Sequence, residues 1–233
     1  MESNKKVSVL IPAYNEEKYI KSTILAVRSI PEVNKIIIVD DGSEDQTVEL
    51  ARSVGATVIT SSNNLGKGGA LNLGAKYVNT DDIIVLLDAD LGKSASEARK
   101  LILPILEDRV DMTIAQFPRA KIKGGFGLVK GLARRGIKVY TGMDMQSPLS
   151  GQRAMTKNVF NKILPFASGY GVEISLTIKT ARMGFRVKEV PVQMTHAETG
   201  RDLKGFLHRG KQFRDILKEL VLLSIKIGKI KNY

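Results

Sequence analysis

The chain has 233 residues, 43% of them hydrophobic, and a formal net charge of +12. It contains no cysteine, which excludes disulfide bonds, thiolate metal sites and cysteine nucleophiles. The amino terminus lacks the apolar stretch of a signal peptide and no window reaches the roughly 18 apolar residues of a membrane span, so we expect a cytoplasmic protein with one large domain.

Positive charge is concentrated in two segments of the chain. Residues 112–143 carry seven lysines and arginines and no acid, and residues 201–233 carry nine basic and three acidic side chains. Such blocks of basic residues are typical of proteins that bind an anionic partner. Three kinds of partner fit: a phosphorylated substrate, an acidic membrane surface or nucleic acid. The same side chains are also typical of an ordinary solvated surface.

Alternating strand and helix patterns through residue 115 predict an α/β fold with a mostly parallel sheet that is covered by helices on both faces. The expected strands are Val7–Ile11, Lys35–Val39, Thr57–Ile59 and Ile83–Leu87. The expected helices are Glu16–Ser29, Asp45–Val54, Gly66–Val78 and one that runs from Ser94 towards Leu106. Capping-box spacing marks the start of two of these helices, at Ser43 with Gln46 and at Ser94 with Glu97.

Beyond residue 115 the pattern is less regular. The glycine-rich stretch Lys123–Gly127 is typical of a loop, Val172–Met183 of a helix and Phe185–Met194 of a strand. Residues 203–224 have the spacing of an amphipathic helix whose basic residues lie mostly off its apolar stripe. Two placements fit this helix, one packed on the domain and one lying on an anionic membrane.

Acidic residues follow three of the predicted strands. Pro12–Glu16 ends the first strand, Asp40–Ser43 the second, and Asp88–Asp90 follows the strand at Ile83–Leu87. In open α/β sheets the ligand lies outside the carboxyl ends of the strands, so these clusters predict a site for a metal and a polar, phosphorylated ligand. The carboxylates of Asp88 and Asp90 are hard oxygen ligands, which suit a Mg²⁺ or Mn²⁺ ion that grips a diphosphate.

Two further motifs fit the same site. Asp40 and Asp41 have the chemistry to accept hydrogen bonds from a base and from ribose hydroxyls, although they can also form a turn before a helix cap. Lys67, in a glycine-rich stretch, can approach a phosphate or a sugar hydroxyl. The chain lacks the Walker spacing, and no G-x-G-x-x-G follows the first strand, so a P-loop and a dinucleotide-binding Rossmann domain are disfavoured.

The ordered set Val7–Glu16, Asp40–Ser43, Gly66–Asn72 and Asp88–Asp90 resembles the nucleotide-sugar half of a family 2 glycosyltransferase with the GT-A fold. The resemblance covers about residues 5–115 and implies a UDP- or GDP-linked hexosyl donor. It implies that Asp88, at the start of Asp88-Ala89-Asp90, contacts the ribose or sugar and that Asp90 holds the metal on the diphosphate. The residues that it places around the nucleoside are Pro12, Ala13, Tyr14, Glu16 and Asp41.

The second half is similar to two groups of such enzymes. Phe117-Pro118-Arg119, and Asp144 ahead of Ser150-Gly151-Gln152-Arg153, resemble dolichyl- and polyprenyl-phosphate hexosyltransferases. This resemblance implies that Arg119 and Arg153 hold the acceptor phosphate. Asp144 lies two residues farther from Ser150 than in that pattern, and the segment after Met194 lacks the lysine signature of the lipid transferases.

Other segments are similar to glucosyl-phosphoglycerate synthases instead: Pro148–Gly151, Gly169–Glu173 and Thr195–Arg201. That resemblance implies that His196 completes the metal shell and that Glu173 faces the acceptor. From the residues alone, His196 can equally be structural and Glu173 can equally cap its own helix.

The excess of basic side chains in the second half favours a phosphate-bearing acceptor, because a phosphate monoester is already anionic at pH 7 and needs no general base. We therefore expect hexosyl transfer to polyprenyl phosphate, by an enzyme that associates peripherally with the inner face of the membrane. The alternative is transfer to the hydroxyl of a soluble phosphorylated acid, with Glu173 or Asp144 as the base. One GT-A domain over residues 1–233 is expected, with a donor half at 5–115, an acceptor half at 116–202 and a basic helix at 203–233.

Two other classes of function are disfavoured. A nucleotidyltransferase opens with a glycine- and arginine-rich loop, which is missing after the first strand. A nucleic-acid-binding module would account for the charge but not for three carboxylate clusters at strand ends, and the chain carries no signature of one. The sequence leaves a homodimer, the sugar and the stereochemistry open.

Overall fold

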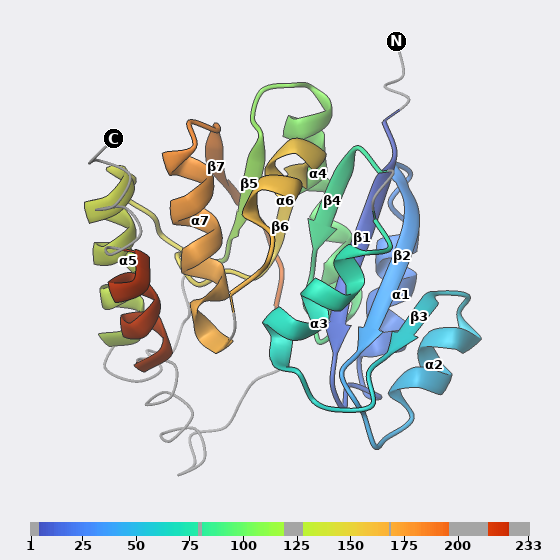
Figure 1. Cartoon of the computed structure of the whole chain (residues 1–233). Coiled ribbons are helices and arrows are strands. Elements are labelled where there is room, and N and C mark those ends of the chain that lie inside the picture. Colours follow the sequence, from blue (N-terminus) through green and yellow to red (C-terminus); the bar gives the residue numbers. More distant parts are fainter. Residues whose placement is uncertain (1–4, 79–80, 119–127, 168, 196–213, 224–233) are drawn as a thin grey trace.

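The computed structural model describes residues 5–78, 81–118, 128–167, 169–195 and 214–223. These residues form a seven-stranded sheet in the order β3-β2-β1-β4-β6-β5-β7, with helices on both faces (Figure 1). All strand pairings are parallel except those of β6, which runs antiparallel to β4 and β5. The predicted fold class, a mostly parallel sheet between helices, is confirmed.

The strands are β1 (Val7–Ala13), β2 (Val33–Asp40), β3 (Thr57–Thr60), β4 (Ile83–Leu86), β5 (Met112–Gln116), β6 (Arg153–Thr156) and β7 (Val187–Pro191). The α-helices are α1 (Ile20–Arg28), α2 (Thr47–Ser53), α3 (Gly66–Ala75), α4 (Arg99–Leu106), α5 (Leu128–Thr141), α6 (Lys157–Ile163) and α7 (Val172–Arg182). Short 3₁₀ helices are η1 (Gly92–Ala98) and η2 (Gly169–Gly171), and a further helix covers residues 214–223.

The central strands are buried on both faces, which explains their nearly continuous apolar sequence. Side chains alternate between the faces of a strand, so Val9 and Ile11 of β1 enter one core while Leu10 enters the other. The first core lies against α1, η1 and α4. The second lies against α3, α5, α6, α7 and helix 214–223.

The predicted helix starts are less accurate than the predicted strands. Neither capping box forms, because tertiary contacts take up both serine hydroxyls. The Oγ of Ser43 accepts a hydrogen bond from the backbone N–H of Asn15 at 2.9 Å, and α2 begins at Thr47 without a side-chain cap. The Oγ of Ser94 lies within η1, where it accepts from the backbone N–H of the distant Thr195 at 3.1 Å and donates to the carbonyl of Leu91 at 2.7 Å.

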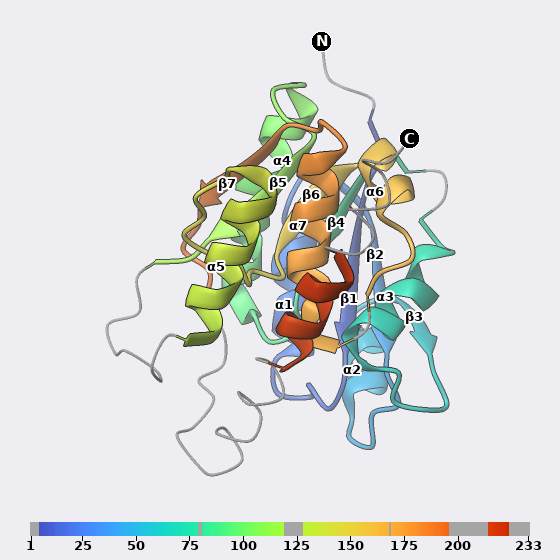
Figure 2. The same ribbon diagram turned by 60° about the vertical axis from the view of Figure 1, so that its left-hand side comes forward.

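The described part of the carboxyl-terminal helix is packed on the protein. Ile216, Leu220 and Leu223 are buried in the second core, and Figure 2 shows this red helix beside α5 and α7. The opposite face leaves the large apolar side chains of Leu217 and Val221 exposed. Of the predicted helix, residues 203–213 and 224 lie outside the described residues, as does the loop Lys123–Gly127. Within the described residues, no helix combines the length and the apolar character needed to cross a membrane.

A glycine in α3 tests how closely this helix packs on the sheet. A Cβ at Gly74 would collide with Leu10 and would lie 2.7 Å from Cγ2 of Val39. We expect Gly74→Ala to lower the free energy of unfolding by about 1–3 kcal/mol in urea denaturation, because the core is overpacked.

Gly131 of α5 is the matched control, since a Cβ there would meet nothing within 4 Å. Gly131→Ala should raise the free energy of unfolding by about 0.5–1 kcal/mol, through helix propensity alone. Equal effects of the two substitutions would contradict the close approach of α3 to β1 and β2.

Candidate functional site

A pocket of about 410 Å³ opens at the carboxyl ends of β1, β2 and β4. It lies where the strand-end acids were expected, at the edge of a parallel sheet that commonly binds ligands. The structure brings together there all of the residues that the sequence predicted on the donor side. The lining residues are Pro12, Ala13, Tyr14, Glu16, Asp41, Lys67, Asp88, Ala89 and Asp90.

The turn after β1 is hydrogen-bonded to the loop after β2. Asn15 has a φ of 54°, a left-handed conformation that asparagine tolerates better than most residues. Its side-chain oxygen accepts from the N–H of Glu44 at 2.9 Å, and the N–H of Glu16 donates to Thr47 Oγ1 at 2.8 Å. These contacts fix Tyr14 and Glu16 at the pocket wall.

Asp41 holds the start of α3. Its Oδ1 accepts from the N–H of Leu65 at 2.7 Å and its Oδ2 from the N–H of Gly66 at 2.8 Å. A carboxylate at the positive end of a helix is favourable, and each oxygen keeps a second lone pair for a ligand. Asp41 therefore orients the first turn of α3, which carries Lys67, in addition to lining the pocket.

Lys67 joins side chains from both halves of the chain. Its Nζ lies 2.7 Å from Oδ1 of Asp88 and 3.0 Å from Oε1 of Glu173 in the first turn of α7. The second oxygen of Asp88 accepts from Nε2 of Gln152 at 2.5 Å. Burial acts to lower the pKa of Lys67, but Asp88 and Glu173 outweigh it and raise the pKa, so the side chain stays a cation.

The absence of a side chain at Gly151 leaves space for the ammonium group of Lys67. A Cβ at this position would collide with Nζ of Lys67 and would lie 3.1 Å from Oδ2 of Asp88. A larger residue at position 151 would thus force Nζ of Lys67 out of its present position between the two carboxylates.

The pocket carries a strongly negative local charge. Burial, followed by the neighbouring carboxylates of Asp90, Asp88 and Asp45, raises the pKa of Glu16 to about 7. Such repulsion between acids, together with oxygen donors at Asp88 and Asp90, fits a hard divalent cation.

The described residues do not form a complete metal shell by themselves. No three acidic or histidine side chains within them are grouped to hold an ion. Mg²⁺ is commonly bound through one or two carboxylates together with substrate phosphates and water, and the Asp88–Asp90 pair is suited to that arrangement. His196, the predicted additional ligand, lies outside the described residues, and its role stays a prediction.

The structure corrects the expectation that Arg153 holds the acceptor phosphate. The side chain is fully buried at 0% exposure. Its Nε donates to the carbonyl of Ser150 at 3.0 Å, and its two terminal nitrogens donate to Thr177 Oγ1 and to the carbonyl of Glu173, each at 2.9 Å. Burial lowers the pKa of Arg153 to about 10. All three donor groups are directed at protein oxygens, away from any ligand in the pocket.

Asp144 is also placed differently from its predicted catalytic role. It is exposed and does not line the pocket at the strand ends. Nε of Arg134 donates to its Oδ1 at 2.6 Å, and this hydrogen bond lowers the pKa of Asp144. Its exposed position outside the pocket makes Asp144 unsuited to serve as the catalytic base. Arg119 lies outside the described residues.

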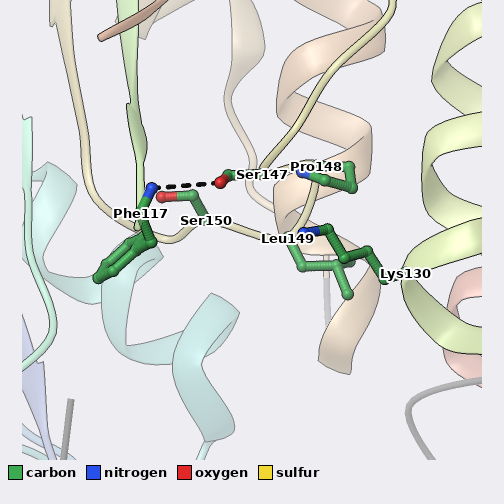
Figure 3. Close-up of a pocket in the computed structure, with 6 residues that line it drawn as sticks. All are labelled: Phe117, Lys130, Ser147, Pro148, Leu149 and Ser150. Atoms are coloured by element: carbon green, nitrogen blue, oxygen red, sulfur yellow. Dashed lines mark hydrogen bonds between the residues drawn. The ribbon is translucent and has the colours of Figure 1, made fainter. Parts of the chain in front are cut away.

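A second, smaller pocket was missed by the sequence reasoning. It has a volume of about 180 Å³ and is lined by Phe117, Lys130, Ser147, Pro148, Leu149 and Ser150 (Figure 3). The backbone N–H of Phe117 donates to Ser147 Oγ at 3.2 Å across it. Ser150 leads directly into Gly151 beside Lys67, so the two pockets adjoin along the chain. The sequence signals for it were the family-like segments at Phe117 and Pro148–Gly151 and the acid-free segment 112–143, from which Lys130 supplies a cation.

Known proteins resemble this chain in sequence and in fold. The sequence model described as glycosyl transferase family 2 matches residues 8–168. The glucosyl-3-phosphoglycerate synthase of Mycolicibacterium smegmatis is 32% identical over 200 residues, covering 76% of this chain and 65% of that protein. Glycosyltransferase AglJ of Haloferax volcanii is 29% identical over 84% of this chain and 65% of its own length. The chain thus spans less than two thirds of these two relatives.

A solved structure is similar over most of the chain. It is the Mycobacterium tuberculosis glucosyl-3-phosphoglycerate synthase in complex with Mn²⁺, UDP and phosphoglyceric acid. The TM-score is 0.76 at 28% identity, with 94% of this chain and 80% of that chain covered.

The glycine beside Lys67 offers a direct test of the ion-paired site. We expect Gly151→Ala to displace the ammonium group and to lower sugar-nucleotide turnover about tenfold or more, because misplaced catalytic groups are costly. Turnover is measured as nucleoside diphosphate release, and thermal unfolding should be little changed, since the lysine can swing outward. Gly131→Ala is the matched control and should leave turnover unaltered. Full activity of Gly151→Ala would show that the ion pairs of Lys67 are dispensable.

Proposed function

The chain belongs to glycosyltransferase family 2, and we propose that it transfers a hexosyl group from a uridine-diphosphate sugar to the hydroxyl of a small phosphorylated acid. One observation carries the proposal. The carboxylate of Glu173 lies 3.0 Å from Nζ of Lys67, which also contacts the strand-end acid Asp88. A hydroxyl acceptor must lose a proton, and a carboxylate at the donor site is the group to receive it.

The donor side follows from the larger pocket. Tyr14 and Asp41 line the part that suits a nucleoside, and Asp88 and Asp90 lie at the end of β4 where a diphosphate and a divalent cation fit. Solved structures of the related mycobacterial synthase contain UDP-glucose with Mn²⁺, or UDP with Mg²⁺, which supports uridine and such a metal here. When bound, the cation supplies positive charge against the departing diphosphate.

In the proposed reaction one carbon–oxygen bond replaces another. The bond between the anomeric carbon and the diphosphate oxygen breaks, and the acceptor oxygen forms the new bond to that carbon. The acceptor proton passes to the carboxylate of Glu173 and then to solvent, while the nucleoside diphosphate leaves with the bonding electrons. Lys67 orients Glu173 and Asp88 and offers its ammonium group to the sugar or the phosphates.

The position of Arg153 weighs against polyprenyl phosphate as the preferred acceptor. That expectation relied on two arginines, and the guanidinium of Arg153 is enclosed by protein oxygens. A phosphorylated acid is supported by the related synthase, whose solved structures contain phosphoglyceric acid. It is supported also by Lys130 in the second pocket, where an acidic group of the acceptor would find a cation.

A lipid phosphate is the second candidate acceptor, and one surface favours it. The outer face of helix 214–223 exposes Leu217, Val221 and Leu222 beside the cations Arg214 and Lys218. A basic helix with exposed apolar side chains is suited to an anionic membrane. The two candidates share the donor half and differ in their need for Glu173.

The acceptor is tested by measuring UDP release from UDP-glucose with Mn²⁺, in the presence of 3-phosphoglycerate or of polyprenyl phosphate in vesicles. We expect 3-phosphoglycerate to stimulate release and Glu173→Gln to lower kcat about 100-fold or more, as expected for loss of a proton acceptor. The amide keeps the size of the side chain, so the KM for UDP-glucose should be nearly unchanged.

The opposite pattern would overturn this choice of acceptor. Stimulation by polyprenyl phosphate alone, with Glu173→Gln still active, would establish the lipid phosphate as the acceptor. GDP-mannose serves as the donor control, because the proposal expects slower release from it than from UDP-glucose.

The metal role of Asp90 has a separate test. Asp90→Asn keeps the shape of the side chain but removes a charged oxygen ligand. We expect Mn²⁺-dependent binding of UDP, followed by calorimetry, to weaken about tenfold or more, because a hard cation prefers carboxylate to amide oxygen. Asp144→Asn, at the exposed acid outside the pocket, should bind UDP like the wild type. Unaltered Mn²⁺ dependence in Asp90→Asn would remove this residue from the metal site.

A further inference from the structure

We propose that Arg153 is a positioning residue, which holds Glu173 and the strand segment beside Lys67 in their working geometry without touching a substrate. The inference rests on the proposed function, since it concerns the alignment of Glu173. Arg153 is the first residue of β6, and β6 lies on the other side of β4 from β1 and β2.

The hydrogen bonds around Arg153 form a closed arrangement. One terminal nitrogen donates to the carbonyl of Glu173 and the other to Thr177 Oγ1, both at 2.9 Å. The same hydroxyl of Thr177 donates to the carbonyl of Glu173 at 2.9 Å. The backbone of Glu173 is therefore held by two side chains in addition to its place in α7.

Arg153 also fixes the opposite wall of the cluster. Its Nε donates to the carbonyl of Ser150 at 3.0 Å. The next two residues meet the donor site directly, because Gly151 makes room for Lys67 and Gln152 donates to Asp88. One guanidinium thus connects the backbone of Glu173 with the segment that lies against Lys67 and its other partner, Asp88.

Burial of the charged guanidinium of Arg153 lowers the stability of the fold, which indicates a role beyond packing. Arg153 is fully buried, and the charges of Glu173 and Glu189 only partly offset the effect of burial on its pKa, since no direct salt bridge to Arg153 is found within the described part of the chain. Its hydrogen-bond partners are two neutral carbonyls and a hydroxyl. A buried charge without an ion pair is expensive, and an apolar side chain of similar size commonly replaces such groups without loss of stability. A rigid, forked donor of this kind does orient several backbone groups at once.

A matched pair of threonine substitutions tests the proposal. Thr177→Val removes the hydroxyl that connects Arg153 with Glu173. Thr113→Val is the control: Thr113 is also fully buried, and its hydroxyl donates to the carbonyl of Leu101 in α4, on the other face of the sheet. We expect Thr177→Val to lose more thermal stability than Thr113→Val, because the hydroxyl of Thr177 both accepts from Arg153 and donates to the carbonyl of Glu173, whereas that of Thr113 only donates.

Activity should separate the two variants. We expect Thr177→Val to lower kcat with 3-phosphoglycerate about tenfold or more while the KM for UDP-glucose stays unchanged, because only the acceptor side is misaligned. Thr113→Val should keep the kcat of the wild type. Arg153→Met should lower kcat further, and Arg153→Lys should recover part of the loss, since an ammonium group still donates to one of the carbonyls.

The outcomes distinguish this inference from the proposed function. If Glu173→Gln is inactive while Thr177→Val and Arg153→Met keep the kcat of the wild type, the positioning role is overturned and the proposed function stands. If Glu173→Gln keeps the kcat of the wild type, both are overturned. Should Arg153→Met fail to fold, Thr177→Val decides alone. Equal loss of kcat in Thr113→Val and Thr177→Val would reduce the network to a structural one.

Discussion

Lys67 lies between two carboxylates that come from distant parts of the sequence, and the site depends on this contact. Asp88 follows β4, Glu173 begins α7, and without a cation between them two acids in a partly enclosed site would repel each other. The lysine is placed by the first turn of α3, which Asp41 anchors through two backbone N–H groups. Removing Asp41, Lys67, Asp88 or Glu173 would therefore disturb the rest of this group. Asp41 positions the helix that carries the lysine, and the lysine neutralises the two carboxylates that hold its ammonium group.

The strand order explains how such distant residues meet. Parallel β1 and β2 are in register from Ser8 onward, with Ala13 opposite Asp40, so their loops open at one level. The reversed direction of β6 brings in the second half of the chain. Since Leu86 at the end of β4 pairs with Arg153 at the start of β6, the residues before β6 lie against those that follow β4. A parallel strand in this position would have carried Gly151 to the other end of the sheet.

The sequence predicted well which strand-end residues line one pocket, because its signals there are local. Each apolar run ends in acids, and parallel strands bring their carboxyl ends together whatever the details of packing. The second half could not be predicted in the same way. The resemblance implied that Arg153 holds an acceptor phosphate, whereas its burial depends on contacts with Thr177 and Glu173 more than ten residues away. Ser43 and Ser94 have cap spacing, yet their hydroxyls accept from the backbone N–H groups of Asn15 and Thr195, contacts that no short motif encodes.

Several basic side chains of the second half are bound by other groups of the protein, which reduces the positive charge available to a ligand. Arg153 is directed at backbone carbonyls, and Arg134 and Lys138 both lie within 4 Å of Asp144, at 2.6 and 3.9 Å. These cations are engaged within the protein, so the count of basic residues overstates the potential that an acceptor phosphate would meet. Lys130 remains at the second pocket, which is enough to recognise one acidic group but leaves the proton of a hydroxyl to be accepted elsewhere. Within the described ranges the acceptor side thus offers few cations beside the carboxylate of Glu173, an arrangement that supports the proposed hydroxyl acceptor, which must be deprotonated, over a phosphate that needs no base.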